Sequence, residues 1–449
     1  MRPISLHDTL SGRRRPLEPR EPGKVGIYAC GPTVYGRIHV GNARPYVVFI
    51  VLKRFLEHEG LATTLVVNVT DVNDKIYDAA RAQGVPSAQL AQEMTAAYVA
   101  DTDGLQLGRP DHEPLASETI EPIVALIADL IESGHAYAAG GDVYFRVRSH
   151  EHYGELSHRD VEQMDQGEGV EGAERKEDPL DFALWKAHKE DEDTSWEAPW
   201  GRGRPGWHIE CSAMAEQLLG VGFEIHGGGS DLVFPHHENE AAQTRAARGA
   251  PLARLWVHNG MVQMGEEKMA KSVGNIRLLH VALQQFGRDA LVMYFLGGHY
   301  RQPLAFSEEL LEEAGRSVDR IRDALRRLQP GPSPSDMAPL KERFFGALAE
   351  DFNTPQALGA LFEWVREANR RSGVGDADLR EMLAVLGFER LEAPSAAIDP
   401  AAADLLQRRE TARAARDFAA ADRLRDELGA LGWEVRDGPN GAELIPHGR

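Results

Sequence analysis

The sequence has few cysteines and no long hydrophobic run, and both shortages exclude whole classes of protein. Its 449 residues contain 2 cysteines, Cys30 and Cys211, too few for a secreted scaffold held by disulfides. The longest apolar run, YVVFIVL at 46–52, is far shorter than the roughly 20 residues that cross a bilayer. The N-terminal segment lacks the apolar stretch of a secretory signal. These observations predict a cytoplasmic protein that does not insert into membranes.

Basic residues are also scarce. The chain has 50 Lys and Arg against 70 Asp and Glu, a formal net charge of −20. This balance argues against nucleic-acid binding, because phosphate contacts need Lys and Arg. The net charge is an average, however, and local basic patches can oppose it. The hydrophobic content of 42% predicts a globular protein with a core.

The first third of the chain alternates strand and helix patterns. GKVGIYAC, which ends at Cys30, predicts a buried strand, 42–60 predicts a helix, and 62–72 predicts a second strand rich in β-branched residues. A strand–helix–strand unit of this kind implies a parallel sheet. We therefore predict an α/β fold with a Rossmann-like parallel-sheet domain, whose ligands bind beyond the carboxyl ends of the strands.

Changes of pattern divide the rest of the chain. Strand and helix patterns resume near 206, and apolar spacings of three and four dominate beyond 306. Two segments have linker composition, at 330–339 and 391–400. The predicted domains are a first half of the sheet domain at 1–110, an inserted subdomain at 111–205, the second half at 206–305, a helical region at 306–395 and a small C-terminal unit at 396–449.

Two distant cysteines and an acidic helix start suggest a metal site. Cys211 lies in GWHIEC, at the end of an expected strand. In PHHENE, Pro235 suits the first position of a helix, which would place His236 and Glu240 on one face. With Cys30, these residues would offer zinc two thiolates, an imidazole and a carboxylate. Residue types alone leave the alternative open, in which the cysteines are small buried hydrophobes and the helix start is solvated.

His237 is the weaker ligand candidate of the pair of histidines. It shares a helical face with Ala241 and reaches Glu240 only obliquely. His237-Glu238 also begins like the HExxH pattern of metalloproteases, but Ala241 occupies the position of the second histidine. A metalloprotease helix is therefore excluded.

The segment HVGN at 39–42 falls where a strand leads into a helix. Gly41 allows close approach of a ligand, and a helix N-terminus attracts phosphate. His39 and Asn42 could add side-chain donors. The segment matches neither GxGxxG nor a Walker P-loop, so an ordinary turn between strand and helix is the alternative.

Two further segments are candidates for nucleotide binding. GEEKMAKSVGN at 265–275 contains Lys268 and Lys271, which could stabilise charge on a transferring phosphoryl group. A solvated surface loop is the alternative for this segment. That alternative loses support because HVGN lies before the segment in the expected order. GGGSD at 227–231 could contact a flat nucleoside, with Asp231 bonding a ribose hydroxyl or an adenine amine. A flexible turn is the alternative for its glycines.

Taken together, these segments resemble the cysteinyl-tRNA synthetases, a family of class I aminoacyl-tRNA synthetases. HVGN is similar to the HIGH signature, and KMAKS is similar to KMSKS with Ala270 in place of the middle serine. CGPTVY, NVTDV, PGWHIECSAM, GGGSDLVFPHHENE, HYRQPLAFS and DFNTPQAL resemble family blocks in the same order, over nearly the whole chain.

The resemblance implies ATP-dependent activation of L-cysteine to cysteinyl-adenylate and its transfer to the 3′ terminal adenosine of cysteine tRNA. It implies one Zn²⁺ per chain, ATP with Mg²⁺, and a monomer whose helical region and terminal unit contact the tRNA stem and anticodon. Zinc would bind the substrate thiolate and so select cysteine over serine. The implied residues are Cys30, Cys211, His236 and Glu240 for zinc; His39, Asn42, Lys268 and Lys271 for catalysis; His39, Gly41, Asn42, Asp231 and Lys271 for ATP; and Thr70 and Trp207 for cysteine.

Two arginine groups are the candidate RNA contacts. A solvated helix whose arginines are offset by nearby acids is the equally supported alternative for each group. The groups are Arg316, Arg320, Arg322, Arg326 and Arg327, and then Arg408, Arg409, Arg413, Arg416, Arg423 and Arg425. Two rival functions stay open, a ligase that joins cysteine to an amino sugar and a non-catalytic RNA-binding homologue. The terminal unit disfavours the first, and the retained His39 and Lys271 disfavour the second.

Overall fold

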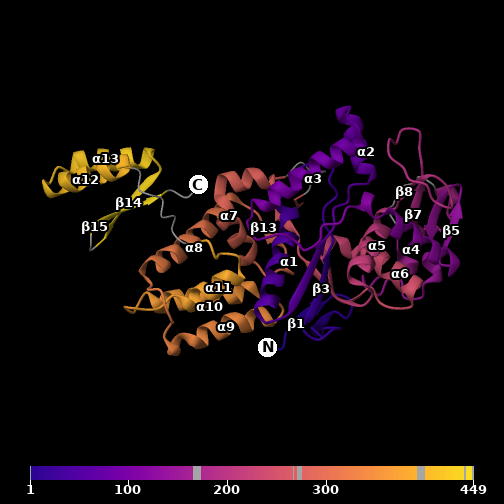
Figure 1. Ribbon diagram of the computed structural model, residues 1–449, viewed down its shortest axis with the longest axis horizontal. Helices are drawn as coiled ribbons and strands as arrows, with labels where there is room; N and C mark the ends of the chain where they lie inside the picture. Colours follow the sequence, from indigo (N-terminus) through magenta and orange to yellow (C-terminus); the bar gives the residue numbers. More distant parts are fainter. Residues whose placement is uncertain are drawn as a thin grey trace.

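A four-stranded parallel sheet lies at the centre of the computed structural model (Figure 1). The structure describes residues 2–164, 173–265, 267–269, 276–391, 400–438 and 441–446. The strand order is β10-β9-β3-β4, and all three pairings are parallel. The strands are β3 (Lys24–Ala29), β4 (Ala62–Val67), β9 (Phe223–Gly229) and β10 (Ala253–Asn259). The predicted Rossmann-like α/β fold is confirmed.

The chain order reverses at the middle of this sheet. From β3, helix α1 (Val40–His58) leads to β4 on one side, whereas β9 and β10 lie on the other. In open α/β sheets, ligands bind at such a switch point, outside the carboxyl ends of the strands. Helix α1 begins two residues before the predicted start at 42, and its stretch from Tyr46 to Leu52 is buried throughout. This helix is therefore enclosed between the sheet and the elements that follow it.

Strand β4 is shorter than the predicted span of 62–72. It ends at Val67 because the next residues pair with the segment after β3 instead of extending the ladder. The Asn68 side chain accepts a hydrogen bond from Gly31 N at 2.9 Å, and Thr70 forms an isolated parallel bridge with Thr33. The carboxyl edge of the sheet is thus closed by two loops that bond to each other.

A separate layer is inserted between β4 and β9. It contains an antiparallel sheet in the order β5-β6-β7-β8, covered by helices and built on its own core around Phe145, Phe182 and Trp185. In Figure 1 it lies at the right of the central sheet. Its elements and the adjoining helices are α2 (Asp74–Gln83), α3 (Ser87–Asp103), α4 (Ile120–Glu132), β5 (Ala136–Ala139), β6 (Asp142–Phe145), β7 (Phe182–Ala187), β8 (Gly203–Pro205) and α5 (Trp207–Leu219).

Short strands and helices complete the region of the parallel sheet. The hairpin of β1 (Ser5–Asp8) and β2 (Arg13–Pro16) opens the chain, and α6 (Glu238–Arg248) joins β9 to β10. A small sheet follows, in which β11 pairs with both β12 and β13. Its members and the helix between them are β11 (Val262–Met264), β12 (Glu267–Lys268), α7 (Leu279–Gly297) and β13 (Leu304–Ala305).

Beyond residue 306 the described chain is mostly helical, as predicted. Phe345 and Trp364 of this region belong to the same core as the parallel sheet. The last elements form a second, small core of Ala402, Leu405, Leu424, Leu428 and Trp433, at the far end from the inserted layer in Figure 1. The elements are α8 (Glu308–Arg327), α9 (Ala338–Ala349), α10 (Thr354–Ala368), α11 (Ala377–Val385), α12 (Pro400–Ala414), α13 (Phe418–Ala430), β14 (Trp433–Gly438) and β15 (Gly441–Pro446).

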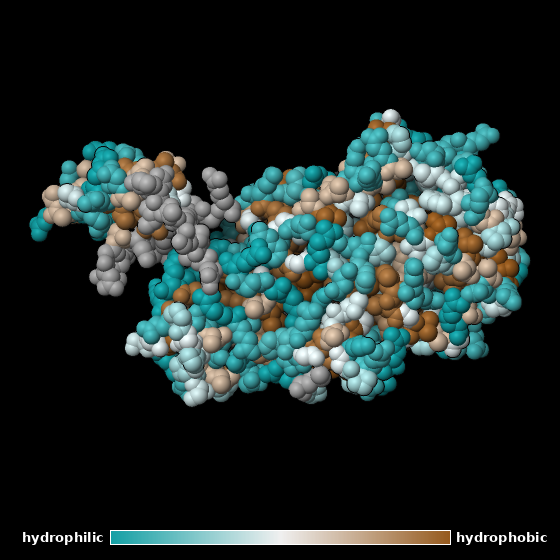
Figure 2. All heavy atoms as spheres, viewed as in Figure 1, coloured by the Kyte–Doolittle hydropathy of each residue, from teal (hydrophilic) through white to brown (hydrophobic). Residues whose placement is uncertain are grey.

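The terminal strands β14 and β15 form an antiparallel hairpin in which Gly438 pairs with Gly441. The two residues between these strands lie outside the described residues, as does most of the predicted linker at 391–400. Hydrophilic residues dominate the face of the molecule seen in Figure 2, with hydrophobic ones in small patches among them. Among the described residues, no helix combines the length and apolar character of a membrane span.

Candidate active site and metal centre

The four predicted metal ligands meet at the switch point of the sheet. Cys30 directly follows β3, Cys211 lies in α5, His236 lies in a π-helical turn (Val233–His237) and Glu240 lies in the first turn of α6. Their ligand atoms all lie within 4.8 Å of one another, and all four residues are buried. Three segments far apart in the sequence thus bring two thiols, an imidazole and a carboxylate to one point.

The local structure around two of these residues differs from the prediction. Cys211 lies inside a helix, because GWHIEC begins α5 rather than ending a strand. Every residue from His208 to Ala215 is buried, so the segment lacks the one-sided apolar stripe that marks a helix in sequence. Helix α6 begins at Glu238 rather than Pro235. The pairing of His236 with Glu240 is nevertheless present, with Nε2 of His236 3.1 Å from Oε1 of Glu240.

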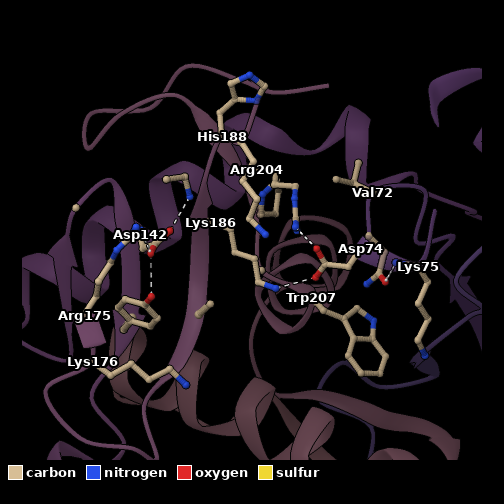
Figure 3. A pocket seen from close by; sticks show the side chains of 18 of the residues that line it. Val72, Asp74, Lys75, Asp142, Arg175, Lys176, Lys186, His188, Arg204 and Trp207 are labelled. Atoms are coloured by element: carbon tan, nitrogen blue, oxygen red, sulfur yellow. Dashed lines mark hydrogen bonds and ion pairs between the residues drawn. The ribbon is translucent and has the colours of Figure 1, made fainter. Parts of the chain in front are cut away.

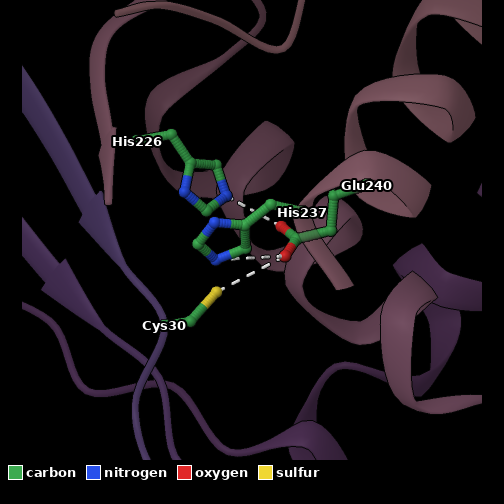
Figure 4. Close-up of side chains that lie close together, drawn as sticks. All are labelled: Cys30, His226, His237 and Glu240. Atoms are coloured by element: carbon green, nitrogen blue, oxygen red, sulfur yellow. Dashed lines mark hydrogen bonds and ion pairs between the residues drawn. The ribbon is translucent and has the colours of Figure 1, made fainter. Parts of the chain in front are cut away.

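The Glu240 carboxylate contacts several other members of the cluster. Its Oε1 lies 3.4 Å from Sγ of Cys30, while its Oε2 lies 2.8 Å from Nε2 of His226. Figure 4 shows His226 and Cys30 each approaching a different oxygen of this carboxylate. Because His226 holds one oxygen, only the other is directed at the thiol and at His236.

A second candidate ligand set overlaps the first. Cys30, His226, His237 and Glu240 also present ligand atoms within 4.8 Å of one another (Figure 4). Nε2 of His237 lies 3.9 Å from Oε1 of Glu240, which agrees with the oblique approach expected from the sequence. The two sets share Cys30 and Glu240.

Other histidines fix the orientation of these ligands. Nδ1 of His236 lies 2.8 Å from Nδ1 of His208, and Nδ1 of His237 lies 2.7 Å from Nε2 of His258. Hydrogen bonds to the distal ring nitrogen are the usual support of a metal-binding histidine. Sequence reasoning missed His208, His226 and His258. A signal existed for the last two, because each is a polar residue within an apolar strand, FEIH or LWVH.

Burial shifts several side chains of the cluster toward their neutral protonation states. Burial raises the pKa of the Cys30 thiol, and the neighbouring Cys211 raises it further. Burial likewise lowers the pKa of His236 and of His237, so both imidazoles are neutral, the form that binds metals. Nε2 of His237 is buried and has no hydrogen-bond partner among the described residues. Sulfur, imidazole and carboxylate donors in one buried space are a set that fits Zn²⁺.

The two predicted cysteine-binding residues lie in α5 and in the loop after β4. Trp207 is the first residue of α5, and its indole stacks on the ring of His236, with centroids 4.3 Å apart and planes 28° apart. Thr70 is buried, and its carbonyl accepts a hydrogen bond from Val34 N at 3.1 Å. Trp207 therefore lies against a predicted metal ligand, and Thr70 lies in the loop that follows β4 at the carboxyl edge of the sheet.

The HVGN segment caps helix α1. His39 is the N-cap, its backbone N–H donates to Oδ1 of Asn42 at 3.1 Å, and its side chain accepts from the Asn42 backbone. A Cβ at Gly41 would lie 2.9 Å from the His39 ring, so glycine lets the ring fold over the helix end. The contacts within the described chain are those of a well-capped turn between strand and helix. Because α1 follows the central strand β3, its first turn lies on the side of the sheet where the strands end at their carboxyl ends.

The segment that leads to the predicted lysines is tied to α1. The buried Arg44 donates to the carbonyl of Gly260 at 2.6 Å and to that of His299 at 3.1 Å. Lys268 lies in β12 and pairs through its backbone with Gln263. Lys271 lies outside the described residues. The structure thus places the start of this segment beside HVGN.

The glycines at 227–229 continue strand β9 rather than following it as a turn. A Cβ at Gly227 would collide with the Phe49 ring of α1. The first glycine therefore makes room for the helix, a role that the sequence pattern did not indicate. Asp231 follows in an exposed turn immediately beyond the strand.

Acidic neighbours offset part of the predicted arginine groups. Arg322 pairs with Asp289 and Asp319, and Arg326 pairs with Asp323 at 2.9 Å. Arg409 is buried, with 5% of its surface exposed. Arg322 and Arg326 therefore fit the structural alternative better than a role in RNA contact, and the burial of Arg409 also argues against such a role.

Comparisons with known proteins show which family the chain resembles. Three family models match: "tRNA synthetases class I (C) catalytic domain" over residues 16–316, "DALR domain" over 343–388 and "Cysteinyl-tRNA ligase anticodon binding domain" over 395–443. A protein of Caldicellulosiruptor saccharolyticus named "Cysteine--tRNA ligase" is 44% identical over 98% of this chain and 99% of its own. One of Halorhodospira halophila with the same name is 45% identical over the same shares of the two chains.

Solved structures share the fold at low sequence identity. Methionyl-tRNA synthetase of Mycobacterium tuberculosis, in complex with methionyl-adenylate, has a TM-score of 0.59 at 16% identity and covers 82% of this chain and 90% of that one. A LeuRS of Agrobacterium radiobacter K84 has a TM-score of 0.62 at 12% identity and covers 84% and 85%.

Proposed function

The chain belongs to the cysteine–tRNA ligase family, and we propose that it activates L-cysteine with ATP and transfers the cysteinyl group to the terminal adenosine of cysteine tRNA. The observation that carries this proposal is the buried cluster of Cys30, Cys211, His236 and Glu240 at the switch point. The cluster lies between Trp207 and the loops that lead to HVGN, where a small amino acid and a nucleotide would meet.

Adenylate formation needs positioning and charge stabilisation more than covalent help. The cysteine carboxylate attacks the α-phosphate of ATP, a carbon–oxygen–phosphorus link forms, and pyrophosphate leaves with the electron pair of the broken P–O bond. The N-terminus of α1 offers its N–H groups to the phosphates, with His39, Gly41 and Asn42 at its end. Lys268 and Lys271 would stabilise the developing charge, and Asp231 would hold the adenosine. Mg²⁺ accompanies ATP as part of that substrate.

Selection of cysteine over serine needs more than shape, because the two differ by one atom. Cys30, Cys211, His236 and Glu240 would hold a zinc ion, which supplies a soft acceptor that prefers thiolate sulfur to hydroxyl oxygen. Trp207 and Thr70 would enclose the substrate beside it. Glu240 is the candidate for the weakest ligand, because His226 already bonds its second oxygen.

The second step transfers the cysteinyl group to tRNA and involves both the catalytic domain and the regions beyond residue 306. The ribose hydroxyl of the terminal adenosine attacks the activated carbonyl, an ester forms, and AMP leaves. We propose that the region at 306–395 contacts the tRNA stem and that the unit at 396–449 contacts the anticodon, in a cytoplasmic monomer. A groove between α8 and α10, of about 580 Å³, supports the first assignment. It is lined by Arg320, Arg327, Arg366 and Arg370 beside Phe362.

One assay separates this function from its rivals. Cysteine-dependent exchange of pyrophosphate into ATP is measured first, and charging of cysteine tRNA is measured next. The proposal predicts both. Exchange without charging would favour a ligase that joins cysteine to an amino sugar, and absence of exchange would favour a non-catalytic RNA-binding protein.

A further inference from the structure

Arg44, in the second turn of α1, is a cation with none of its surface exposed. Within the part of the chain that the structure describes, no carboxylate forms an ion pair with it, and its Nε has no hydrogen-bond partner. Burial lowers the pKa of Arg44 to about 10, so the guanidinium is still charged at neutral pH. A buried charge without a counter-ion is costly, and its presence at this place needs a reason.

The other guanidinium nitrogens donate to backbone carbonyls of two separate segments. Nη1 donates to the carbonyl of Gly260 at 2.6 Å and to that of Met261 at 3.3 Å, between β10 and β11. Nη2 donates to the carbonyl of His299 at 3.1 Å, between α7 and β13. The planar fork of an arginine can hold two segments at once, whereas the ammonium group of a lysine is a single point. One side chain of α1 therefore joins both segments to the helix.

Each of these three carbonyls also accepts a hydrogen bond from a donor other than Arg44. Burial of the carbonyls is therefore satisfied without the guanidinium, and the cost of burying it is not explained by the needs of the backbone. The other donors are Nδ2 of Asn259, at 3.1 Å from the Gly260 oxygen, and the backbone N–H groups of Leu304 and Gln302, at 2.9 and 3.0 Å from the oxygens of Met261 and His299.

The first of the two segments leads directly to a predicted catalytic lysine. Strand β11 follows Met261 and pairs in antiparallel fashion with β12, in which Lys268 lies opposite Gln263. Strand β11 also pairs with β13, which follows the second segment. By holding the carbonyls before both strands, Arg44 fixes where the backbone of Lys268 lies relative to α1.

Backbone hydrogen bonds join another segment to the same end of α1. The N–H of Val40 donates to the carbonyl of Arg277 at 2.9 Å, and the N–H of Leu279 donates to that of Ile38 at 3.0 Å. These bonds do not depend on the identity of a side chain. The chain before β12 and the chain that enters α7 are thus both held at the helix end that HVGN caps, the first of them by Arg44.

We propose that Arg44 is a positioning residue for adenylate formation, which holds the strand pair that carries Lys268 against the phosphate-binding end of α1. The inference rests on the proposed function, in which Lys268 stabilises the charge that develops during transfer to the α-phosphate. Displacement of such a group by about 1 Å can slow a reaction by about 100-fold. The contacts of Arg44 are to backbone carbonyls, so it acts through Lys268 and not on the reacting atoms.

The test is a double-mutant cycle in cysteine-dependent pyrophosphate exchange. Arg44→Met removes the donors from a side chain of similar length, Lys268→Ala removes the proposed charge stabiliser, and a third protein combines the two changes. For these proteins and the unsubstituted chain, kcat, KM for ATP and zinc content are measured. Two changes that act through the same group fail to add, whereas independent defects add in free energy and multiply in rate.

The expected result is a loss of rate that Lys268→Ala conceals. Arg44→Met should lower kcat by about 10–100-fold and change KM for ATP by less than about twofold, the pattern of an interaction made only in the transition state. Zinc content should not change. Lys268→Ala should lower kcat by about 100-fold, and the double variant should lie within about twofold of Lys268→Ala alone.

Arg54→Met is the matched control. Arg54 lies in the same helix and also donates to a carbonyl, that of Ala384 at 2.8 Å, but toward the other end of α1. This variant should keep kcat within about twofold of the unsubstituted chain. Its small effect should multiply with that of Lys268→Ala, because the two positions act independently.

Arg44→Lys keeps the cycle informative if Arg44→Met does not fold. A lysine retains the charge but cannot hold both segments, so kcat should still fall and should again fail to add to Lys268→Ala. Multiplied losses would overturn the proposal, as would an unchanged kcat in folded Arg44→Met. Full activity of Arg44→Lys would also overturn it, because charge alone would then suffice. Absence of exchange in the unsubstituted chain would refute the proposed function too, whereas exchange with multiplied losses would refute this inference alone.

Discussion

The candidate metal centre and the cation-lined cavity lie on either side of Trp207, and they are built in opposite ways. The cluster is fully buried, and its ligands are held by further contacts, such as the 2.8 Å contact between Glu240 and His226. The cavity lies between α2 and the inserted layer, has a volume of about 720 Å³, is open to solvent and is lined by six Lys and Arg but three Asp and Glu (Figure 3). Part of its positive charge is carried at the end of long flexible side chains such as Lys75. Under the proposed function, the first design would fix atoms against a substrate that differs from its competitor by one atom. The second places positive charge in an open space, where salt screens it.

This difference predicts how each half responds to substitution. In the buried half no water can replace a missing partner, so removal of one group leaves its neighbours unsatisfied. In the open half water and salt take over, and an exposed charge is worth little. The predictions below run from the largest expected effect to the smallest.

Cys211→Ser should have the largest effect, because a hydroxyl is a poor substitute for a thiolate in a buried zinc site. We expect loss of bound zinc and of cysteine-dependent pyrophosphate exchange. Metal content is measured by atomic emission beside the exchange rate. Met214→Leu, a buried change of similar volume in the same helix, is the control and should retain both. Full exchange by a zinc-free Cys211→Ser protein would refute the assignment of the cluster.

Arg204→Met tests whether loss of one partner of a buried ion pair beside the cavity is as costly as loss of a group from the buried cluster. The Arg204 side chain is 2% exposed, and its Nε bonds to Glu192, itself 3% exposed, at 3.0 Å. Removal of one partner of a buried pair costs about 3–5 kcal/mol. We expect the free energy of unfolding in urea to fall by about that amount, whereas Arg202→Met at an exposed site should change it by less than about 0.5 kcal/mol. A small decrease for Arg204 would show that water reaches the pair.

His226→Ala removes a support of the cluster without removing a predicted ligand of the first set. Loss of such an outer contact typically weakens metal binding by about 10–100-fold. The zinc dissociation constant, measured by competition with a chelator, should rise by that factor, while the partly exposed control His152→Ala leaves it unchanged. Complete loss of zinc in the His226 variant would instead favour the second ligand set, in which His226 itself binds the metal.

Lys75→Gln should have the smallest effect, because water replaces the contacts of an exposed ammonium group. We expect an unchanged free energy of unfolding, within about 0.5 kcal/mol, and an unchanged zinc content. The measurements are urea unfolding at low and at high salt, beside atomic emission. An effect of Lys75→Gln as large as that of Cys211→Ser would contradict the division between a rigid half and an electrostatic half.

Sequence reasoning located the switch point well because its signals are local. The β-branched strand before Asn68 and the turn around Gly41 predicted the parallel sheet and its carboxyl edge, and the family resemblance named the metal ligands. It failed where burial hides periodicity, as in α5, whose enclosed segment around Cys211 was expected to be a strand. It also missed His208 and Arg204, because their partners His236 and Asp74 are distant in sequence. The role of Lys271 stays a prediction.

The most direct test of the account measures zinc content and amino-acid activation in one preparation. The chain is partly depleted of zinc with a chelator, and pyrophosphate exchange is followed with cysteine and with serine at each level of metal. The account predicts that exchange with cysteine falls in proportion to the zinc removed, returns when zinc is restored, and is absent with serine throughout. Exchange with cysteine that continues unchanged in zinc-free protein would contradict it.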